Sequence, residues 1–179
     1  MKTKVFIDGS AGTTGLRIVE RMSGRADVEL LTLPEEKRKD LSARAEMVNA
    51  ADAAFLCLPD GAAREIAAAA GETVRLIDAS TAHRTAPGWQ YGFPELSAEF
   101  REGIVSGNRV AVPGCHASGM VAILYPMVKA GILPPDYPVT IFSLTGYSGG
   151  GKKMIAEYET DGRPLTVGAP RAYGLNQNH

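Results

Sequence analysis

The stretch KVFIDGSAGTTG, residues 4–15, decides the fold of this chain. Lys4 to Asp8 predicts a short apolar strand, and Gly12 to Ser23 predicts an amphipathic helix. The turn between them has the glycine spacing G-x-x-G-x-x-G, a variant of the dinucleotide fingerprint G-x-G-x-x-G. Glycine lets backbone approach a pyrophosphate closely, and a helix N-terminus supplies N–H donors. We therefore predict a nucleotide site formed by Gly9, Ser10, Ala11, Gly12, Thr13, Thr14 and Gly15. The alternative is a tight turn that binds no ligand.

Strands and helices alternate through the first half of the chain. Strands are expected over 28–33, 53–58 and 75–78, and helices over 41–49 and 62–70. This order predicts an α/β fold built on a doubly wound parallel (Rossmann) sheet.

The alternation weakens past Thr81, and Pro134-Pro135-Asp136 is a clear break. After it, Val139 to Thr145 alternates like a strand. We expect a nucleotide-binding domain over 1–132 that carries the cysteine helix described below, followed over 133–179 by the start of an α+β substrate domain whose remainder is missing.

Bulk properties exclude several classes of protein. The chain has 179 residues and a formal net charge of −1, which gives no indication of a nucleic-acid or membrane surface. No apolar run approaches the roughly 20 residues that span a bilayer. Because Met1 to Lys4 lead straight into the first predicted strand, we expect no signal peptide. The 2 cysteines cannot form a disulfide scaffold, so we expect a reducing, cytoplasmic setting. We expect no bound metal.

The cofactor choice depends on the end of the second predicted strand. NAD sites usually carry an acidic residue there, whereas NADP sites carry a cation for the 2′-phosphate. This chain has Pro-Glu-Glu-Lys-Arg-Lys at 34–39. The basic triplet favours NADP with Arg38 as its ligand, although Glu35 and Glu36 leave NAD open. Leu58 and Pro59, at the end of the third strand, are expected to border the cofactor.

A second chemical feature is VAVPGCHASG at residues 110–119. Cys115 follows the Pro113-Gly114 turn and precedes an apolar run that predicts a helix. A thiol at a helix N-terminus is favoured as thiolate, which attacks acyl and carbonyl carbon. The alternative is a packing cysteine, which is the interpretation we adopt for Cys57.

Four segments carry a family resemblance: residues 9–15, DASTAHR at 78–84, YGFPEL at 91–96 and VPGC at 112–115. Their order and spacing resemble the N-acetyl-γ-glutamyl-phosphate reductases, arginine-pathway relatives of aspartate-semialdehyde dehydrogenase. Residues 146–152 resemble that family's glycine-rich substrate loop, and residues 173–179 resemble the start of its histidine-bearing segment. The chain is similar to the shorter variety, but it has His116 where the family has tyrosine.

The resemblance implies reductive dephosphorylation of an acyl phosphate. Cys115 would displace inorganic phosphate from N-acetyl-γ-glutamyl phosphate, and NADPH would reduce the resulting thioester to the semialdehyde. His179 would be the first histidine of the family's catalytic segment; His116 and His83 are weaker candidates for the acid or base. The resemblance also implies a homodimer or homotetramer and substrate contacts from Ser80, Arg84, Ser148, Gly149 and Lys152.

Two other functions stay open. An aspartate-semialdehyde dehydrogenase-like enzyme would use the same cysteine chemistry on another acyl phosphate. A non-catalytic nucleotide-sensing module would use the glycine turn alone, with Cys115 serving only in packing.

Overall fold

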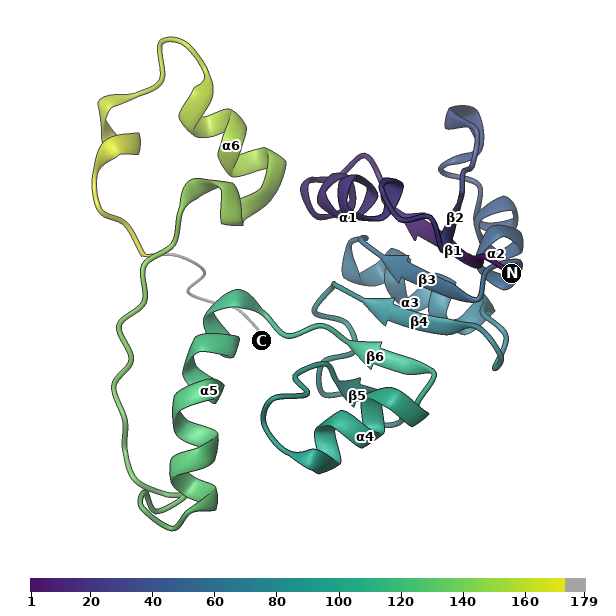
Figure 1. The fold of residues 1–179 in the computed structure, drawn as a ribbon. Coiled ribbons are helices and arrows are strands. Elements are labelled where there is room, and N and C mark those ends of the chain that lie inside the picture. The colour runs from purple at the N-terminus through teal and green to yellow at the C-terminus, as the bar shows by residue number, and fades with distance from the viewer. Residues whose placement is uncertain (173–179) are drawn as a thin grey trace. The chain divides into compact units, whose positions relative to one another are not determined.

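The computed structural model describes residues 1–172, and the chain divides after Pro135 into two compact units (Figure 1). The first unit holds the predicted sheet and the cysteine helix. The second begins at Asp136 and is described by itself below. Within the described residues, no helix is both long and apolar enough to cross a membrane.

The first unit is built on a sheet in which every neighbouring pair of strands is parallel. The order is β2-β1-β3-β4-β6-β5. The strands are β1 (Thr3–Asp8), β2 (Val28–Leu31), β3 (Ala53–Leu56), β4 (Arg75–Asp78), β5 (Gln90–Tyr91) and β6 (Arg109–Ala111). The predicted doubly wound parallel sheet is confirmed. The strands β2 and β3 are each two residues shorter than expected, and β5 and β6 were not predicted.

Helices lie between several of these strands and after the last one. They are α1 (Thr13–Ser23), α2 (Leu41–Asn49), α3 (Asp60–Ala69), α4 (Ala98–Ser106) and α5 (Cys115–Lys129), with a 3-10 turn, η1 (Glu35–Lys37), before α2. Right-handed crossovers place α1 on one face of the sheet and α2 and α3 on the other, because the strand order reverses direction after β2. The main buried cluster lies between the sheet and the helices α2 and α3. It includes Leu56 of β3, Leu76 of β4, Val48 of α2 and Ile66 of α3.

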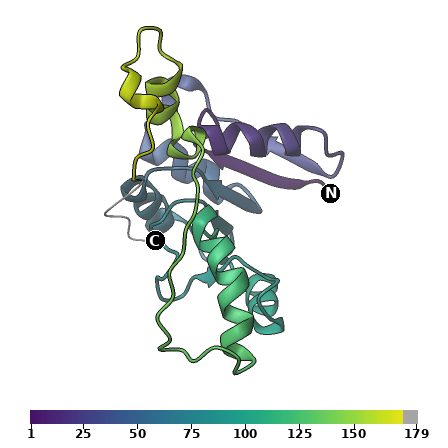
Figure 2. The same cartoon turned by 90° about the vertical axis from the view of Figure 1, so that its left-hand side faces the viewer.

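The reversal of strand order fixes where a ligand can bind. The connection from β1 leads to β2 on one side, while β3 and β4 lie on the other. Ligands of open parallel sheets bind outside the carboxyl ends of the strands at such a switch point. Asp8, Leu56, Asp78 and Ala111 end four neighbouring strands at this edge. The longest helix of the described chain, α5, starts a few residues after β6 ends (Figure 2).

The second unit is helical in its described part. It contains η2 (Tyr147–Gly150), α6 (Gly151–Glu159) and η3 (Leu165–Gly168). The Tyr147 and Tyr158 rings stack with centroids 4.9 Å apart, and the Tyr147 hydroxyl donates to Glu159 Oε1 at 2.9 Å. These contacts hold η2 against α6.

The strand predicted over residues 139–145 is wrong for the structure as described. Within residues 1–172 this segment forms no ladder with another strand. Its apolar side chains are exposed, with Phe142 at 86% and Leu144 at 82%. Alternation gives a segment the side chains of a strand, but a strand exists only where a neighbour supplies backbone hydrogen bonds.

Candidate active site at the carboxyl edge of the sheet

The glycine turn after β1 has a geometry that only glycine permits. Gly9 has φ +84°, and a Cβ there would lie 2.2 Å from the Cys57 carbonyl oxygen. A Cβ on Gly15, in the first turn of α1, would lie 2.3 Å from the Gly9 carbonyl oxygen. Gly9 therefore packs against the end of β3, and Gly15 brings α1 against the turn.

Glycine also precedes two of the helices that begin at this edge. Gly12 is the N-cap of α1 and Gly114 is the N-cap of α5, and neither helix has a side-chain cap. By contrast, α2 is capped by the Asp40 carboxylate, which accepts from the Ser42 and Ala43 N–H groups. The first N–H groups of a helix lack intrahelical acceptors. Both α1 and α5 therefore present N–H donors to an anion, whereas α2 does not.

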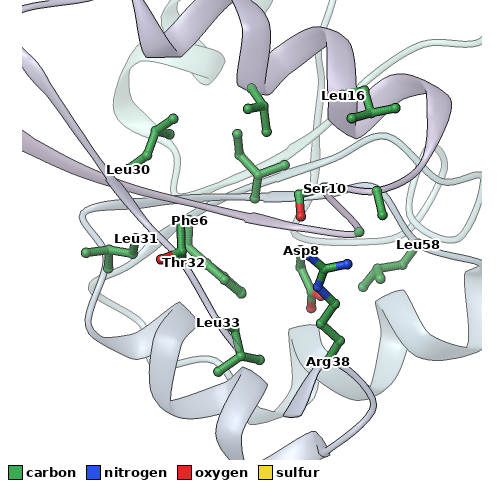
Figure 3. A pocket seen from close by; sticks show the side chains of 14 residues that line it. Phe6, Asp8, Ser10, Leu16, Leu30, Leu31, Thr32, Leu33, Arg38 and Leu58 are labelled. Atoms are coloured by element: carbon green, nitrogen blue, oxygen red, sulfur yellow. The ribbon is translucent and has the colours of Figure 1, made fainter. Parts of the chain in front are cut away.

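A pocket of about 390 Å³ lies beside the glycine turn (Figure 3). Its walls are mostly apolar, and Gly9, Ser10 and Ala11 lie at one end. Apolar walls beside a glycine turn fit the adenine ring of a dinucleotide. The phosphates of the same dinucleotide would then reach the helix N-terminus. Two other predicted cofactor residues, Arg38 and Leu58, also line the pocket. Pro59 is the N-cap of α3. The start of α1, which follows the turn in the chain, is formed by Gly12, Thr13, Thr14 and Gly15.

Arg38 lies just past η1, after the end of β2, and its side chain points into the pocket (Figure 3). Its guanidinium Nη1 lies 3.5 Å from Glu35 Oε1, and the side chain is 45% exposed. Glu35 and Glu36 do not line the pocket. Among the pocket-lining residues of the described chain, Asp8 carries the only carboxylate. The Arg38 guanidinium in the pocket, with Glu35 and Glu36 outside the pocket lining, therefore suits a 2′-phosphate.

Asp8 is paired with Arg44, an arginine for which no sequence pattern predicts a role in the site. Arg44 of α2 donates through Nε to both Asp8 carboxylate oxygens, at 3.2 and 3.0 Å, and its Nη2 lies 2.9 Å from Oδ2. Both side chains are buried. This ion pair ties α2 to the end of β1, directly before the glycine turn.

The loop after β4 is fixed by a second buried carboxylate. Asp78 is fully buried and accepts from the Ser80 backbone N–H at 2.9 Å and from the Ser80 hydroxyl at 2.7 Å. His83 Nδ1 lies 2.6 Å from Asp78 Oδ2, and the His83 ring stacks on Trp89 with centroids 4.0 Å apart. The Ser80 hydroxyl and the His83 ring are thus both committed to Asp78.

Asp60, the first residue of α3, holds the same loop from the other side. It accepts from the Thr81 N–H at 3.0 Å and from the Thr81 hydroxyl at 2.5 Å. The hydroxyl hydrogen bond outweighs the opposing effect of burial and lowers the pKa of Asp60. Two carboxylates therefore set the path of residues 78–84.

This path brings Arg84 to the start of the cysteine helix. Arg84 Nε donates to the Val112 carbonyl at 3.0 Å. A Cβ on Gly114 would lie 2.8 Å from Arg84 Nη1, so the guanidinium rests against the residue that precedes Cys115. The structure thus brings together two of the predicted site residues, Arg84 and Cys115.

The two cysteines have different surroundings. Cys115 is exposed and is the first residue of α5. Cys57 is partly buried behind the glycine turn, and burial, followed by the negative charges of Asp8 and Asp78, raises its pKa to about 11. A thiol held protonated in this way is a poor nucleophile.

The other predicted substrate and catalytic residues belong to the second unit or to the part of the chain outside the described residues. Ser148 and Gly149 lie in η2 and Lys152 lies in the first turn of α6, all in the second unit. His179 lies outside the described residues. Within the described part of the chain, no cluster of three or more His, Cys, Asp or Glu side chains could hold a metal ion.

Comparisons with known proteins match both parts of the chain. Residues 4–103 match the family model "Semialdehyde dehydrogenase, NAD binding domain", and residues 115–179 match "Semialdehyde dehydrogenase, dimerisation domain". A protein from Chelativorans sp. (strain BNC1), named N-acetyl-gamma-glutamyl-phosphate reductase, is 53% identical over 100% of this chain and 57% of its own length. One from Pseudomonas putida, named N-acetyl-gamma-glutamyl-phosphate reductase 2, is 53% identical over 98% of this chain and 56% of its own. The chain thus spans little more than half the length of these relatives.

Solved structures show the same fold. An aspartate semialdehyde dehydrogenase from Francisella tularensis matches with a TM-score of 0.63 and 17% identity, over 87% of this chain and 48% of that one. Aspartate semialdehyde dehydrogenase II from Vibrio cholerae matches with a TM-score of 0.61 and 20% identity, over 99% of this chain and 57% of that one.

Proposed function

This chain belongs to the semialdehyde dehydrogenase family, and from that premise we propose that it carries the dinucleotide site and the nucleophile of an N-acetyl-γ-glutamyl-phosphate reductase, an enzyme of arginine biosynthesis. The proposal depends on one observation above all. The exposed thiol of Cys115 starts α5 at the same sheet edge as the glycine turn, with the Arg84 guanidinium against the preceding residue. The relatives named above have the corresponding activity in their names.

Cys115 is the nucleophile of this reaction. Its sulfur attacks the acyl carbon of the acyl phosphate, the carbon–oxygen bond to phosphate breaks, and inorganic phosphate leaves with that electron pair. The N–H groups at the start of α5 stabilise negative charge that develops near the sulfur and the carbonyl oxygen. The glycine turn and Arg38 would hold NADPH, which would supply the hydride that reduces the thioester carbon. Expulsion of the Cys115 sulfur then releases the semialdehyde.

Arg84 is the cation that receives the phosphate group beside Cys115, because its charge is held against Gly114 at the start of α5. Ser80 contributes to the same site by fixing the loop through Asp78, to which its hydroxyl donates. From the second unit, Ser148, Gly149 and Lys152 are further substrate ligands in this proposal. His179 is its general acid or base, a role suited to imidazole.

NADP is the proposed cofactor. Arg38 lines the pocket, whereas Glu35 and Glu36 are not among its lining residues. We propose a homodimer or homotetramer, which the dimerisation-domain match supports. Two free cysteines fit a reducing cytoplasm. Neither nucleic acid nor a membrane has a part in this proposal.

The test is the reverse reaction catalysed by the complete natural protein that contains this chain. N-acetylglutamate semialdehyde, inorganic phosphate and NADP are supplied, and NADPH formation is followed by absorbance. We expect reduction that depends on phosphate and is faster than with aspartate semialdehyde. A preference for aspartate semialdehyde would assign the other dehydrogenase activity. Binding of dinucleotide with no reaction on either aldehyde would favour a sensing module.

A further inference from the structure

The buried pair of Asp8 and Arg44 is not explained by the catalytic proposal. Asp8 lines the dinucleotide pocket at the carboxyl end of β1, one residue before Gly9. A carboxylate at that point repels every phosphate group of a dinucleotide, and a low-dielectric wall strengthens the repulsion. A pocket for a polyanion therefore needs this charge to be cancelled.

Arg44 cancels it from behind the pocket. Its side chain is 8% exposed and the Asp8 side chain 6% exposed, so water screens the pair weakly. Arg44 is not among the pocket-lining residues of the described chain, and it meets Asp8 through Nε at 3.0 Å. Its buried Nη2, 2.9 Å from Asp8 Oδ2, has no aligned hydrogen-bond partner among the described residues.

Stability alone is a weak reason for such a pair, because the desolvation of two buried charges offsets most of their attraction. The pair does have a specific position. It joins α2 to the end of β1, next to the pocket into which Arg38 points. Neutralising Asp8 leaves Arg38, whose Nη1 lies 3.5 Å from Glu35 Oε1, as the charged side chain that decides the potential among the described residues lining the pocket.

We propose that Arg44 is a specificity-determining residue: by neutralising Asp8 it lets the pocket prefer a dinucleotide with an additional 2′-phosphate over one without it. Arg44 acts through Asp8 and does not touch the cofactor. The inference rests on the proposed function, because it assumes that this pocket binds the adenosine end of NADP.

The experiment is a charge cycle at the two positions. NADP⁺ and NAD⁺ are titrated into the full chain by calorimetry at low salt, and the ratio of the two dissociation constants is compared for Arg44→Met, Asp8→Asn and the double variant. Arg21→Met is the control, because Arg21 is an exposed arginine in the last turn of α1.

For Arg44→Met we expect the preference for NADP to fall by about tenfold, because NADP carries one more phosphate group than NAD for the unpaired carboxylate to repel. Added salt should restore part of this loss, which a purely structural defect would not show. Asp8→Asn should keep or raise the preference, and the double variant should lie within about threefold of the wild type, because neither leaves a carboxylate facing the phosphate.

Two results would overturn the inference. Equal weakening of NADP⁺ and NAD⁺ in Arg44→Met would make the pair structural. A double variant as poor as Arg44→Met would mean that Arg44 contacts the phosphate itself. If Arg44→Met does not fold, Asp8→Asn and the double variant still test the inference. Loss of the preference for NADP⁺ over NAD⁺ in both variants would contradict charge cancellation. If the wild type binds neither dinucleotide, the proposed function fails and this inference fails with it.

Discussion

Arg84 Nε donates to the carbonyl oxygen of Val112 at 3.0 Å, which ties the loop after β4 to the segment that leads into Cys115. The loop is held at its base by Asp78 and Asp60, both through hydrogen bonds to Ser80, Thr81 or His83. The position of the guanidinium relative to the thiol therefore depends on strands β4 and β6, which precede the loop and the cysteine helix.

Replacing Arg84 by Met should raise the KM for the acyl phosphate by about tenfold to a hundredfold, because a charged hydrogen bond to phosphate contributes about 1.5–3 kcal/mol. Arg84→Lys should recover part of the loss by keeping the charge. Steady-state kinetics measures both. Arg101→Met, at an exposed position on α4, is the matched control and should leave KM unchanged. An unchanged KM in Arg84→Met would remove Arg84 from the substrate site.

The two cysteines should differ in reactivity towards iodoacetamide. At pH 7.5, Cys115 should be alkylated first, because it is exposed while Cys57 is partly buried with its pKa raised to about 11. Alkylation proceeds through the thiolate, so labelling of Cys57 should increase with pH and level off only near its pKa. Peptide mass spectrometry of timed samples gives both rates. Faster labelling of Cys57 at neutral pH would contradict the assignment of Cys115 as the reactive thiol.

Gly9→Ala should destabilise the first unit. The substitution places a Cβ 2.2 Å from the Cys57 carbonyl oxygen and forces alanine to φ +84°. The backbone conformation alone costs about 1–2 kcal/mol, and the clash adds to it. Urea unfolding of the variant measures the loss. Gly24→Ala is the matched control, since a Cβ there meets nothing within 4 Å. Equal stability of the two variants would show that the turn is looser than described.

Asp78→Asn should also destabilise the protein, because an amide NH₂ group replaces one of two acceptor oxygens. Ser80 and His83 both donate to the carboxylate, so at least one buried donor would lose its partner, at a cost of about 1–3 kcal/mol. Asp27→Asn is the control, because Asp27 pairs with Arg25 on the exposed surface. Thermal unfolding of both variants makes the comparison, and equal melting temperatures would contradict it.

The parallel sheet and the glycine turn could be predicted from sequence because both have local signals. A continuous apolar run at 53–58 marks a buried strand, and the glycine spacing marks the turn after β1. Cys115 was identified for the same reason, since proline, glycine, thiol and an apolar run follow one another.

The ion pairs of the site could not be predicted. Asp8 and Arg44 are 36 positions apart, and no periodicity in the sequence connects them. The contacts of Asp78 could not be predicted either, because the arrival of His83 and Ser80 at its carboxylate depends on the path of the loop. The strand expected over 139–145 fails for a related reason: an alternating pattern does not specify the neighbour that a strand needs.

The most direct test of the central claim compares wild type with Cys115→Ala in the complete natural protein, using the phosphate-dependent reduction of NADP by N-acetylglutamate semialdehyde. Binding of NADP is measured in both as the control for folding. We predict normal NADP binding in both proteins and turnover in the wild type alone. Turnover in Cys115→Ala equal to that of the wild type would show that Cys115 is not the nucleophile.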